Sequence, residues 1–555
     1  MMVLCTFLMA SCKEDAAVIS EITLAKEQIA FDTNAGNSIL AIKTNTAWTI
    51  SSADSWCTVS PSSGGAGTKQ ITVTVSKNLS DGTRTTKLTV KAGDLSKEVT
   101  ITQTLEKLQL DKDSVSFDTN GGEFTLNIQA TASYSVVTPS WITLKSTSTD
   151  GKSQIFTVNN NGLIYSRQGK IIYTSGLLKD SVVVTQTGKS ISIPADASGM
   201  SSDAKTLASK MYLGWNIGNT LEAPGGENAW GNPNVSQLLI DSIKAAGFNA
   251  VRIPCAWDSH LSDAANYTIN PTWLARVKEV VDYCYKNNMY VIVNIHWDGG
   301  WLENNPTYAK QAAVNAKQKA LWEQIAVYFR NYDEHLLFAG TNEVHADYNT
   351  PTTENITVQE SYNQTFVNAV RSTGGKNYYR NLIIQSYNTN INYAYSNMTM
   401  STDVVSNRLF AEVHYYDPWD FCGDTSASMK YYWGSPYSSL GVSSYGQEDF
   451  MRAQFAKMKT KFVDKGIPVI LGEFGAMRRS TLTGTSLTNH LASRAYFYQY
   501  LVQQARNNGI IPFLWDTGIS GNNDMGIFVR STGVASDKQA LAAIKAGAAE
   551  SSYPY

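Results

Sequence analysis

The 555-residue chain has little of what marks several large classes of protein. Lys and Arg total 45 against 47 Asp and Glu, and no basic run exceeds a pair such as Arg478-Arg479, which argues against nucleic-acid binding. The six cysteines form no CxxC pair, so neither a disulfide framework nor a zinc site is indicated. HExxH and a glycine-rich phosphate loop are also missing. We therefore expect no cofactor and no metal, although a structural Ca²⁺ held by loop oxygens would leave no mark in the sequence.

The first 18 residues are typical of a secretion signal followed by an acidic segment. The apolar run at 1–10 is too short to span a bilayer. ASC at 10–12 resembles a bacterial lipobox, and KED at 13–15 resembles the surface-export signal of Bacteroidetes lipoproteins. Met9 stands where lipoboxes usually have leucine, and no Lys or Arg precedes the run, so an ordinary cleaved signal is the alternative. We expect lipidation of Cys12 and a place on the outer membrane surface of a Gram-negative bacterium, with secretion or the periplasm as the alternative.

Residues 19–188 contain two imperfect copies of one strand-rich pattern. FDTNAG at 31–36 recurs as FDTNGG at 117–122, and VTITQT at 99–104 recurs as VVVTQT at 182–187. Alternating runs such as ITVTV at 71–75, separated by Gly, Ser and Asp-Gly turns, are typical of β-sandwich strands. The copies resemble BACON domains, immunoglobulin-like modules often found ahead of carbohydrate-active enzymes in Bacteroidetes. We expect one module at 19–105 and a second at 106–188.

The function of these modules has two interpretations. Their aromatic side chains could form a flat surface for sugar rings, but a tryptophan buried in a sandwich core is the commoner case. We favour a spacer role over glycan binding. The aromatic residues concerned are Trp48, Trp56, Tyr134 and Trp141.

After a serine-rich linker at 189–202, apolar strands alternate with amphipathic helices. The expected strands are 213–219, 250–255, 290–296, 337–343, 382–386, 409–416, 469–474 and 511–515, and the expected helices are 237–246, 273–286, 317–329, 449–465 and 493–507. Eight strands, mostly followed by helices, predict a (β/α)8 TIM barrel over 203–555. A doubly wound sheet is the alternative, but no glycine-rich phosphate loop supports it.

Two of the expected strands end in a glutamate. LLFAGTNE at 336–343 reaches Glu343, and PVILGEF at 468–474 contains Glu473. A carboxylate has no packing role at the C-terminal end of a buried strand, and the active site of a barrel forms at that end. Hydrolysis of a glycosidic bond requires two such groups, one to protonate the leaving oxygen and one to attack or to activate water. A salt-bridged strand end would explain a single glutamate equally well, but not two.

Seven short motifs follow one another along the chain, each at the end of an expected strand. They are GWNIGNT at 214–220, VRIP at 251–254, IHW at 295–297, TNE at 341–343, VHYY at 413–416, GEFG at 472–475 and LWD at 514–516. Together they resemble glycoside hydrolase family 5 of clan A. GWNIGNT followed by ENAWGNP at 227–233 is most similar to subfamily 4, which contains endo-β-1,4-glucanases, many of them active on xyloglucan. The chain departs from the family at Val344, where many members have proline.

The resemblance implies a role for each matching residue. Glu343 would be the acid/base and Glu473 the nucleophile of a reaction that retains configuration. Arg252 and Tyr416 would hydrogen-bond Glu473, and Asn342 would bind the sugar 2-hydroxyl. The remaining matches would contact sugar in or next to the −1 subsite: His296, His414, Trp515 and Asn219.

Two further expectations concern the cleft. Because Glu343 must be protonated when substrate binds, we expect its pKa to lie above that of Glu473. Tryptophans in the loops after the second, third and sixth strands are candidate stacking platforms along an open cleft. These are Trp257, Trp301, Trp419 and Trp433.

The favoured function is a retaining endo-β-1,4-glucanase that hydrolyses cellulosic, mixed-linkage or xyloglucan chains. An endo-β-1,4-mannanase or glucomannanase is an alternative within the family. A catalytically silent glycan-binding lipoprotein is an alternative of another class, but the presence of both glutamates argues against it. We expect a monomer whose partners are the polysaccharide and the lipid of the outer membrane.

Overall fold

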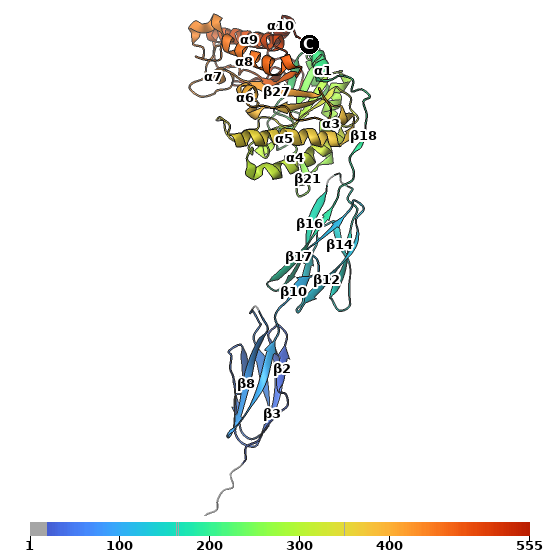
Figure 1. The fold of residues 1–555 in the computed structure, drawn as a ribbon. Coiled ribbons are helices and arrows are strands. Elements are labelled where there is room, and N and C mark those ends of the chain that lie inside the picture. The colour runs from blue at the N-terminus through green and yellow to red at the C-terminus, as the bar shows by residue number, and fades with distance from the viewer. Residues whose placement is uncertain (1–18, 81, 163, 165, 349) are drawn as a thin grey trace, which may run out of the picture. The chain divides into compact units, whose positions relative to one another are not determined.

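The computed structural model describes residues 19–80, 82–162, 164, 166–348 and 350–555. The predicted signal segment and its lipidation site, Cys12, lie outside the described residues. The chain divides into two compact units, Met1–Lys189 and Ser190–Tyr555 (Figure 1). Each unit is described by itself below. In the described part of the chain, no helix has both the length and the apolar character needed to cross a membrane.

The first unit contains two β-sandwich modules, as predicted. In module 1 one core takes side chains from both sheets, and strand β7 shows why: Ile71, Val73 and Val75 are buried while the threonines between them are not. The sheets have the orders β1-β3-β7-β5 and β2-β9-β8-β4-β6. The strands are β1 (Ile22–Leu24), β2 (Gln28–Phe31), β3 (Gly36–Thr44), β4 (Trp48–Ser52), β5 (Cys57–Ser60), β6 (Ser63–Gly64), β7 (Gly67–Val75), β8 (Arg84–Ala92) and β9 (Leu95–Gln103).

Module 2 repeats this plan with four strands in each sheet. The orders are β10-β12-β15-β14 and β11-β17-β16-β13, and the two sheets again share one core. The strands are β10 (Leu108–Leu110), β11 (Ser114–Phe117), β12 (Gly122–Ala130), β13 (Ser135–Val137), β14 (Ile142–Thr147), β15 (Ser153–Val158), β16 (Arg167–Ser175) and β17 (Leu178–Gln186).

In each module an arginine lies over the face of a tryptophan ring. The Arg84 guanidinium lies 4.3 Å from the centre of the Trp56 ring and donates from Nε to Gln103 Oε1 at 3.0 Å. Module 2 has the same arrangement, with Arg167 at 4.4 Å from the Trp141 ring and at 2.9 Å from the oxygen of its own glutamine. The glutamine of the repeated TQT motif therefore anchors an arginine over an indole face. This cation–π contact explains why all three residue types recur.

The second unit is a closed barrel of eight strands joined by parallel pairing, which confirms the predicted fold class. The barrel strands are β19 (Gly214–Ile217), β20 (Ala250–Ile253), β23 (Tyr290–Asn294), β24 (Leu336–Ala339), β26 (Leu382–Gln385), β27 (Leu409–Tyr415), β28 (Val469–Phe474) and β29 (Ile510–Asp516). The fourth strand ends four residues before Glu343, so this residue stands in a loop rather than at the end of the strand as predicted.

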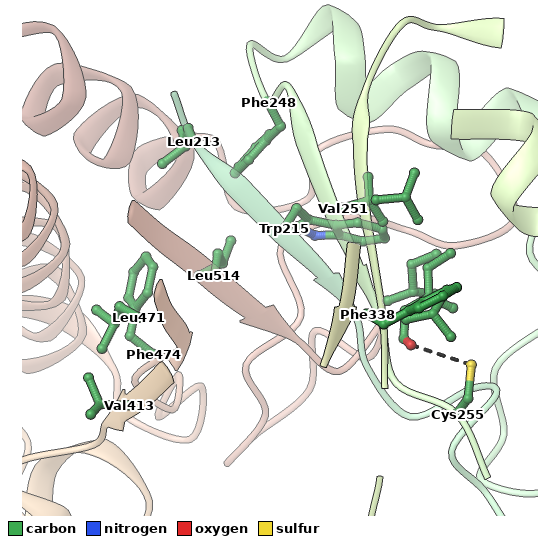
Figure 2. Close-up of a cluster of buried hydrophobic side chains, with 14 of the residues drawn as sticks. Leu213, Trp215, Phe248, Val251, Cys255, Phe338, Val413, Leu471, Phe474 and Leu514 are labelled. Atoms are coloured by element: carbon green, nitrogen blue, oxygen red, sulfur yellow. Dashed lines mark hydrogen bonds between the residues drawn. The ribbon is translucent and has the colours of Figure 1, made fainter. Parts of the chain in front are cut away.

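Along the barrel strands, successive side chains belong alternately to two separate hydrophobic clusters. One set packs with helix residues in the large core; Figure 2 shows Trp215 there with its register neighbours Val251 and Leu514. The other set forms a smaller cluster built mainly from the strands themselves, which is the lower interior of the barrel. Two residues further along the same strands, the interior positions become polar although they remain fully buried. This upper layer consists of Asn216, Arg252, Asn294, Gln385 and Glu412.

Most helices of the second unit cover the outside of the barrel, whereas α1 (Ala204–Lys210) packs against its lower interior and α7 (Trp419–Cys422) lies beside a cavity. The other helices are α2 (Gln237–Ala245), α3 (Pro271–Lys286), α4 (Tyr308–Tyr328), α5 (Thr353–Ser372), α6 (Ile391–Ser396), α8 (Glu448–Lys461), α9 (Gly484–Asn507) and α10 (Lys538–Ala549). The sequence pattern did not predict α5, which is rich in Thr, Asn and Val and so has a low intrinsic helix propensity. Its capping box at Thr352 and buried Tyr362 and Phe366 stabilise it instead.

Residues 189–202, predicted to be a linker, pack on the barrel from Ser190 onwards. The short strand β18 (Ile193–Ala195) pairs with β25 (Gly374–Gly375). Ser202 is buried, and its backbone N–H donates to Glu334 Oε2 at 2.8 Å. Of the serines in this predicted linker, Ser198, Ser201 and Ser202 are bonded to side chains of the barrel.

Candidate active site

The two predicted catalytic glutamates meet at the C-terminal end of the barrel. Glu473 belongs to β28, and Glu343 extends from the loop after β24. One oxygen of each glutamate and one ring nitrogen of His414 all lie within 4.8 Å of one another. The Glu343 side chain is 29% exposed and that of Glu473 only 7%, so Glu343 is the more accessible of the two.

Both oxygens of Glu473 accept hydrogen bonds from the predicted partners. Arg252 Nη1 donates to Oε1 at 2.9 Å, and the Tyr416 hydroxyl donates to Oε2 at 3.0 Å. Burial raises the pKa of the Tyr416 hydroxyl well above its usual value, which keeps it a donor. These two contacts fix the orientation of the Glu473 carboxylate and stabilise its ionised form.

Asn342 is held by a cation on one side and a carboxylate on the other. Its Oδ1 accepts from Arg252 Nη2 at 2.7 Å, and its Nδ2 donates to Glu303 Oε2 at 3.3 Å. Burial, helped by the negative charge of Glu343, raises the pKa of Glu303 to about 8. With its oxygen occupied, the amide has only N–H left for a sugar hydroxyl, which agrees with the implied contact to the 2-hydroxyl.

His414 links three carboxylates. Its Nδ1 lies 2.7 Å from Glu343 Oε1 and its Nε2 lies 3.2 Å from Glu412 Oε1, while Glu473 Oε2 is 3.7 Å from Nδ1. Burial alone would lower the pKa of His414. The negative charge of Glu473 and the contacts with the other two glutamates instead raise this pKa to about 10.

The expected order of the two catalytic pKa values is wrong for the free enzyme. Burial raises the pKa of Glu343, but the hydrogen bond from His414 and the positive charges of His414 and Arg252 together outweigh it, and the pKa is lowered. Burial raises the pKa of Glu473 although His414 and Arg252 oppose it. The expectation follows from the two glutamates alone. It does not place a protonated histidine against Glu343.

Some of the residues predicted to contact sugar line the cavity, and others do not. Trp515 lines the cavity, and its ring stacks on His296 with centres 5.8 Å apart and planes 8° apart. Burial lowers the pKa of His296 well below its usual value, and Arg252 adds to this effect, so this ring is neutral. Asn219 lies in the loop after β19 with a φ of 58°, and it is not among the residues that line the cavity.

Of the four candidate platforms, one stands open at the cleft. Trp419 is 55% exposed and lines the cavity. The predictions for Trp257 and Trp433 are wrong, because both are fully buried and donate from Nε1 to backbone carbonyls of Asn294 and Gly446. Trp301 is partly buried, and the Lys317 ammonium lies 4.3 Å from its ring centre, so one of its faces is occupied.

The cavity has a volume of about 810 Å³. Several residues that line the cavity were not predicted from the sequence, because they come from loops far apart in the chain and no periodic pattern marks such positions. These lining residues are Tyr348, Asn388, Thr389, Asn523, Asp524 and Met525. Glu412 was missed too, although it lies two residues before His414 and therefore on the same side of β27, a spacing that could have indicated it. Trp230 and Trp297 lie in the motifs quoted from the sequence but were not named as platforms; they are 41% and 39% exposed, and their ring centres are 6.4 Å apart.

The departure at Val344 has a local explanation. Val344 is fully buried and belongs to a small cluster with Leu302 and Tyr362. Its carbonyl accepts from Asn388 N at 2.9 Å. The loop that carries Glu343 is thus held by packing and a backbone hydrogen bond without the proline.

Comparison with known proteins agrees with this geometry. Residues 216–521 match the family described as "Cellulase (glycosyl hydrolase family 5)", and residues 46–104 match BACON, described as "Putative binding domain, N-terminal". A xyloglucan-specific endo-beta-1,4-glucanase of Bacteroides ovatus is 38% identical over 457 residues, which cover 78% of this chain and 90% of that relative.

Solved structures give the same result. A Bacteroides ovatus GH5 xyloglucanase in complex with a XXXG heptasaccharide has a TM-score of 0.63 at 33% identity, covering 96% of this chain and all of that one (100%). A GH5-4 broad specificity endoglucanase from Clostridium cellulovorans has a TM-score of 0.57 at 31% identity, covering 64% of this chain and 98% of that one.

Proposed function

The chain belongs to glycoside hydrolase family 5, and we propose that it is a retaining endo-β-1,4-glucanase whose preferred substrate is xyloglucan. The observation that carries the proposal is the pair of glutamates with oxygens within 4.8 Å, one of them held by Arg252 and Tyr416. Retaining enzymes have carboxylates about 5–5.5 Å apart, whereas inverting ones leave about 6.5–9.5 Å for a water molecule. The spacing supports direct attack by Glu473.

The geometry gives a double displacement. Glu473 attacks the anomeric carbon while Glu343 protonates the leaving glycosidic oxygen, which gives a glycosyl ester on Glu473. Glu343 then removes a proton from the water that hydrolyses this ester, and the configuration is retained. Asn342 contacts the 2-hydroxyl, whose hydrogen bond strengthens as positive charge develops on the ring. Arg252 and Tyr416 fix the attacking carboxylate throughout.

Two observations support xyloglucan over other β-glucans. Relatives of this chain are named for xyloglucan, and one solved relative holds a XXXG heptasaccharide. The cavity also has a volume of about 810 Å³, with Trp419 exposed on its wall, and a branched chain needs more room beside the backbone than a linear one. An open cleft on a long polysaccharide favours attack within the chain.

A substrate panel tests this proposal. We expect the purified protein to release reducing ends fastest from xyloglucan, then from mixed-linkage glucan and carboxymethylcellulose, with early products of mixed length. NMR of the first products should show the β-anomer before mutarotation. Faster hydrolysis of mannan or glucomannan would favour a mannanase, and binding without any turnover would favour a silent glycan-binding protein.

We also propose that the mature protein is an outer-membrane lipoprotein with its modules acting as spacers. The lipobox-like ASC at 10–12 supports the anchor. The arginines over Trp56 and Trp141 support the spacer role, because a covered indole face offers no platform to a sugar. Replacement of Cys12 by Ser, followed by cell fractionation and surface protease treatment, tests the anchor: the variant should leave the membrane fraction.

A further inference from the structure

A third glutamate, Glu412, lies beneath the two catalytic carboxylates. It belongs to β27 and is fully buried in the upper layer of the barrel. Gln385 Nε2 donates to its Oε2 at 2.6 Å. Its Oε1 lies 3.2 Å from Arg252 Nε and 3.2 Å from His414 Nε2. A buried carboxylate is costly unless such partners compensate it, so these contacts are essential to its presence there.

The neighbouring strand leaves room for this carboxylate. Gly472 on β28 precedes Glu473, and a Cβ atom at Gly472 would lie 2.0 Å from Glu412 Oε1 and 2.9 Å from His414 Nε2. Any side chain at this position would displace both groups. The absence of a side chain at Gly472 is therefore what allows Glu412 to reach His414.

Each cation that contacts Glu412 also contacts a catalytic carboxylate. Arg252 reaches Glu473 at 2.9 Å, and His414 reaches Glu343 at 2.7 Å. Both ring nitrogens of His414 thus face carboxylate oxygens, which only accept hydrogen bonds when ionised. Two such contacts require a proton on both nitrogens. Without Glu412, the ring would need only one.

We propose that Glu412 is a positioning residue that keeps His414 doubly protonated, so that the His414–Glu343 pair stores the proton delivered to the leaving group. This inference rests on the proposed glycosidase function. The proton passes from His414 Nδ1 to Glu343 and from Glu343 to the glycosidic oxygen, as the glycosidic bond breaks and the bond from Glu473 to the anomeric carbon forms. His414 is then neutral. In the second step, the proton that Glu343 removes from the attacking water restores the pair.

The proposal fixes the direction of a pH effect. The pKa of His414 is raised by its carboxylate neighbours, and loss of the Glu412 charge should lower it. The pair then loses its proton at a lower pH, so the basic limb of kcat/KM should move toward acid. Besides Glu412, the titratable or charged groups that face the His414–Glu343 pair are Arg252, His296, Glu303, His345, Tyr348, Tyr416 and Glu473.

The first test compares three variants on xyloglucan across pH. In Glu412→Gln, which keeps the shape but not the charge, we expect kcat to fall about 10–100-fold, less than the about 10²–10⁴-fold typical of general acid/base help itself. KM should change little, and the basic limb should move down by about one pH unit or more. Glu412→Asp keeps the charge and should retain most of the basic limb. Glu334→Gln removes a largely buried carboxylate that bonds Ser202 and Lys210 and should leave the profile in place.

The second test needs no turnover, so it separates this inference from the proposed function. In wild-type protein labelled with ¹⁵N-histidine, the His414 ring should carry protons on both nitrogens at about pH 8, above the ordinary histidine pKa. The signal is assigned by its loss in His414→Gln. A neutral His414 at that pH would overturn the proposal, even if Glu412→Gln fails to fold. An unchanged pH profile in a folded Glu412→Gln, checked by near-UV circular dichroism, would overturn it too.

Discussion

The β-sandwich modules and the barrel each use an arginine to bond neighbouring polar side chains, with opposite results. In module 1, Arg84 covers Trp56 and donates to Gln103 and to the Ser76 carbonyl. Its bonding capacity is used within the module. In the barrel, Arg252 orients Glu473 and Asn342, which keep unused bonding capacity for substrate: further lone pairs on the Glu473 oxygens and a second N–H on the Asn342 amide. The difference shows that residue type alone does not define a functional site. A site exists where the fold leaves oriented groups incompletely bonded.

Replacement of Glu473 should have the largest effect on activity. In Glu473→Ala we expect turnover on β-glucan to fall by roughly 10⁴-fold or more, the scale of losing a nucleophile. Stability should fall as well, because Arg252 is fully buried and would keep only Glu412 as an ionic partner. A carboxylate in an open cleft would add little to folding, but the Glu473 side chain is only 7% exposed. Azide should partly restore activity and give a glycosyl azide of inverted configuration.

Arg84→Ala in module 1 is the matched control for that experiment, because it removes the corresponding kind of contact from the other region. It should leave kcat on soluble β-glucan unchanged. Wild-type-like turnover in Glu473→Ala would remove Glu473 from the mechanism.

Glu343→Gln should give the next largest effect. Substrates with poor leaving groups should lose about 10²–10⁴-fold, because they need general acid help. Activated aryl glycosides should lose far less in the first step, since their departure needs little protonation. Parallel measurements of both substrate types give the answer. Equal losses would show that Glu343 is not the acid.

Two tryptophans that are near in sequence sharpen the comparison within the barrel. Trp433→Ala removes a fully buried indole and should lower the free energy of unfolding by about 3–5 kcal/mol. Trp419→Ala removes an exposed one and should change stability by only about 0.5 kcal/mol while raising KM for polysaccharide. Chemical denaturation and steady-state kinetics on both variants check this. Similar stability losses in the two would contradict the assigned burial.

Deletion of residues 19–188 should have the smallest effect. Activity on soluble β-glucan should stay nearly constant, because every residue of the site comes from the second unit. The discriminating measurement is activity on insoluble or cell-wall substrate. A large drop there would favour glycan binding by the modules over the spacer role.

The fold was predictable because its signals are local. Apolar strands, turn residues and each copy of the repeated motifs are only a few residues long, and the strand-end motifs marked Glu343, Glu473 and Arg252. Exposure was not predictable, as Trp257 and Trp419 show: each follows a barrel strand by four residues, yet one is fully buried and the other open. The position of His414 against Glu343 also depends on two strand ends meeting in space, which no sequence pattern encodes.

The residue at position 472 helps to identify relatives of this enzyme that have lost activity. A methyl group there would crowd out Glu412 and His414 while every acidic residue of the reaction stayed in the sequence. A gene copy with alanine at this place would keep the full set of motif glutamates and lose the space that lets them cooperate. Paralogues that have drifted from hydrolysis to mere carbohydrate retention can therefore be recognised at a position that itself performs no chemistry.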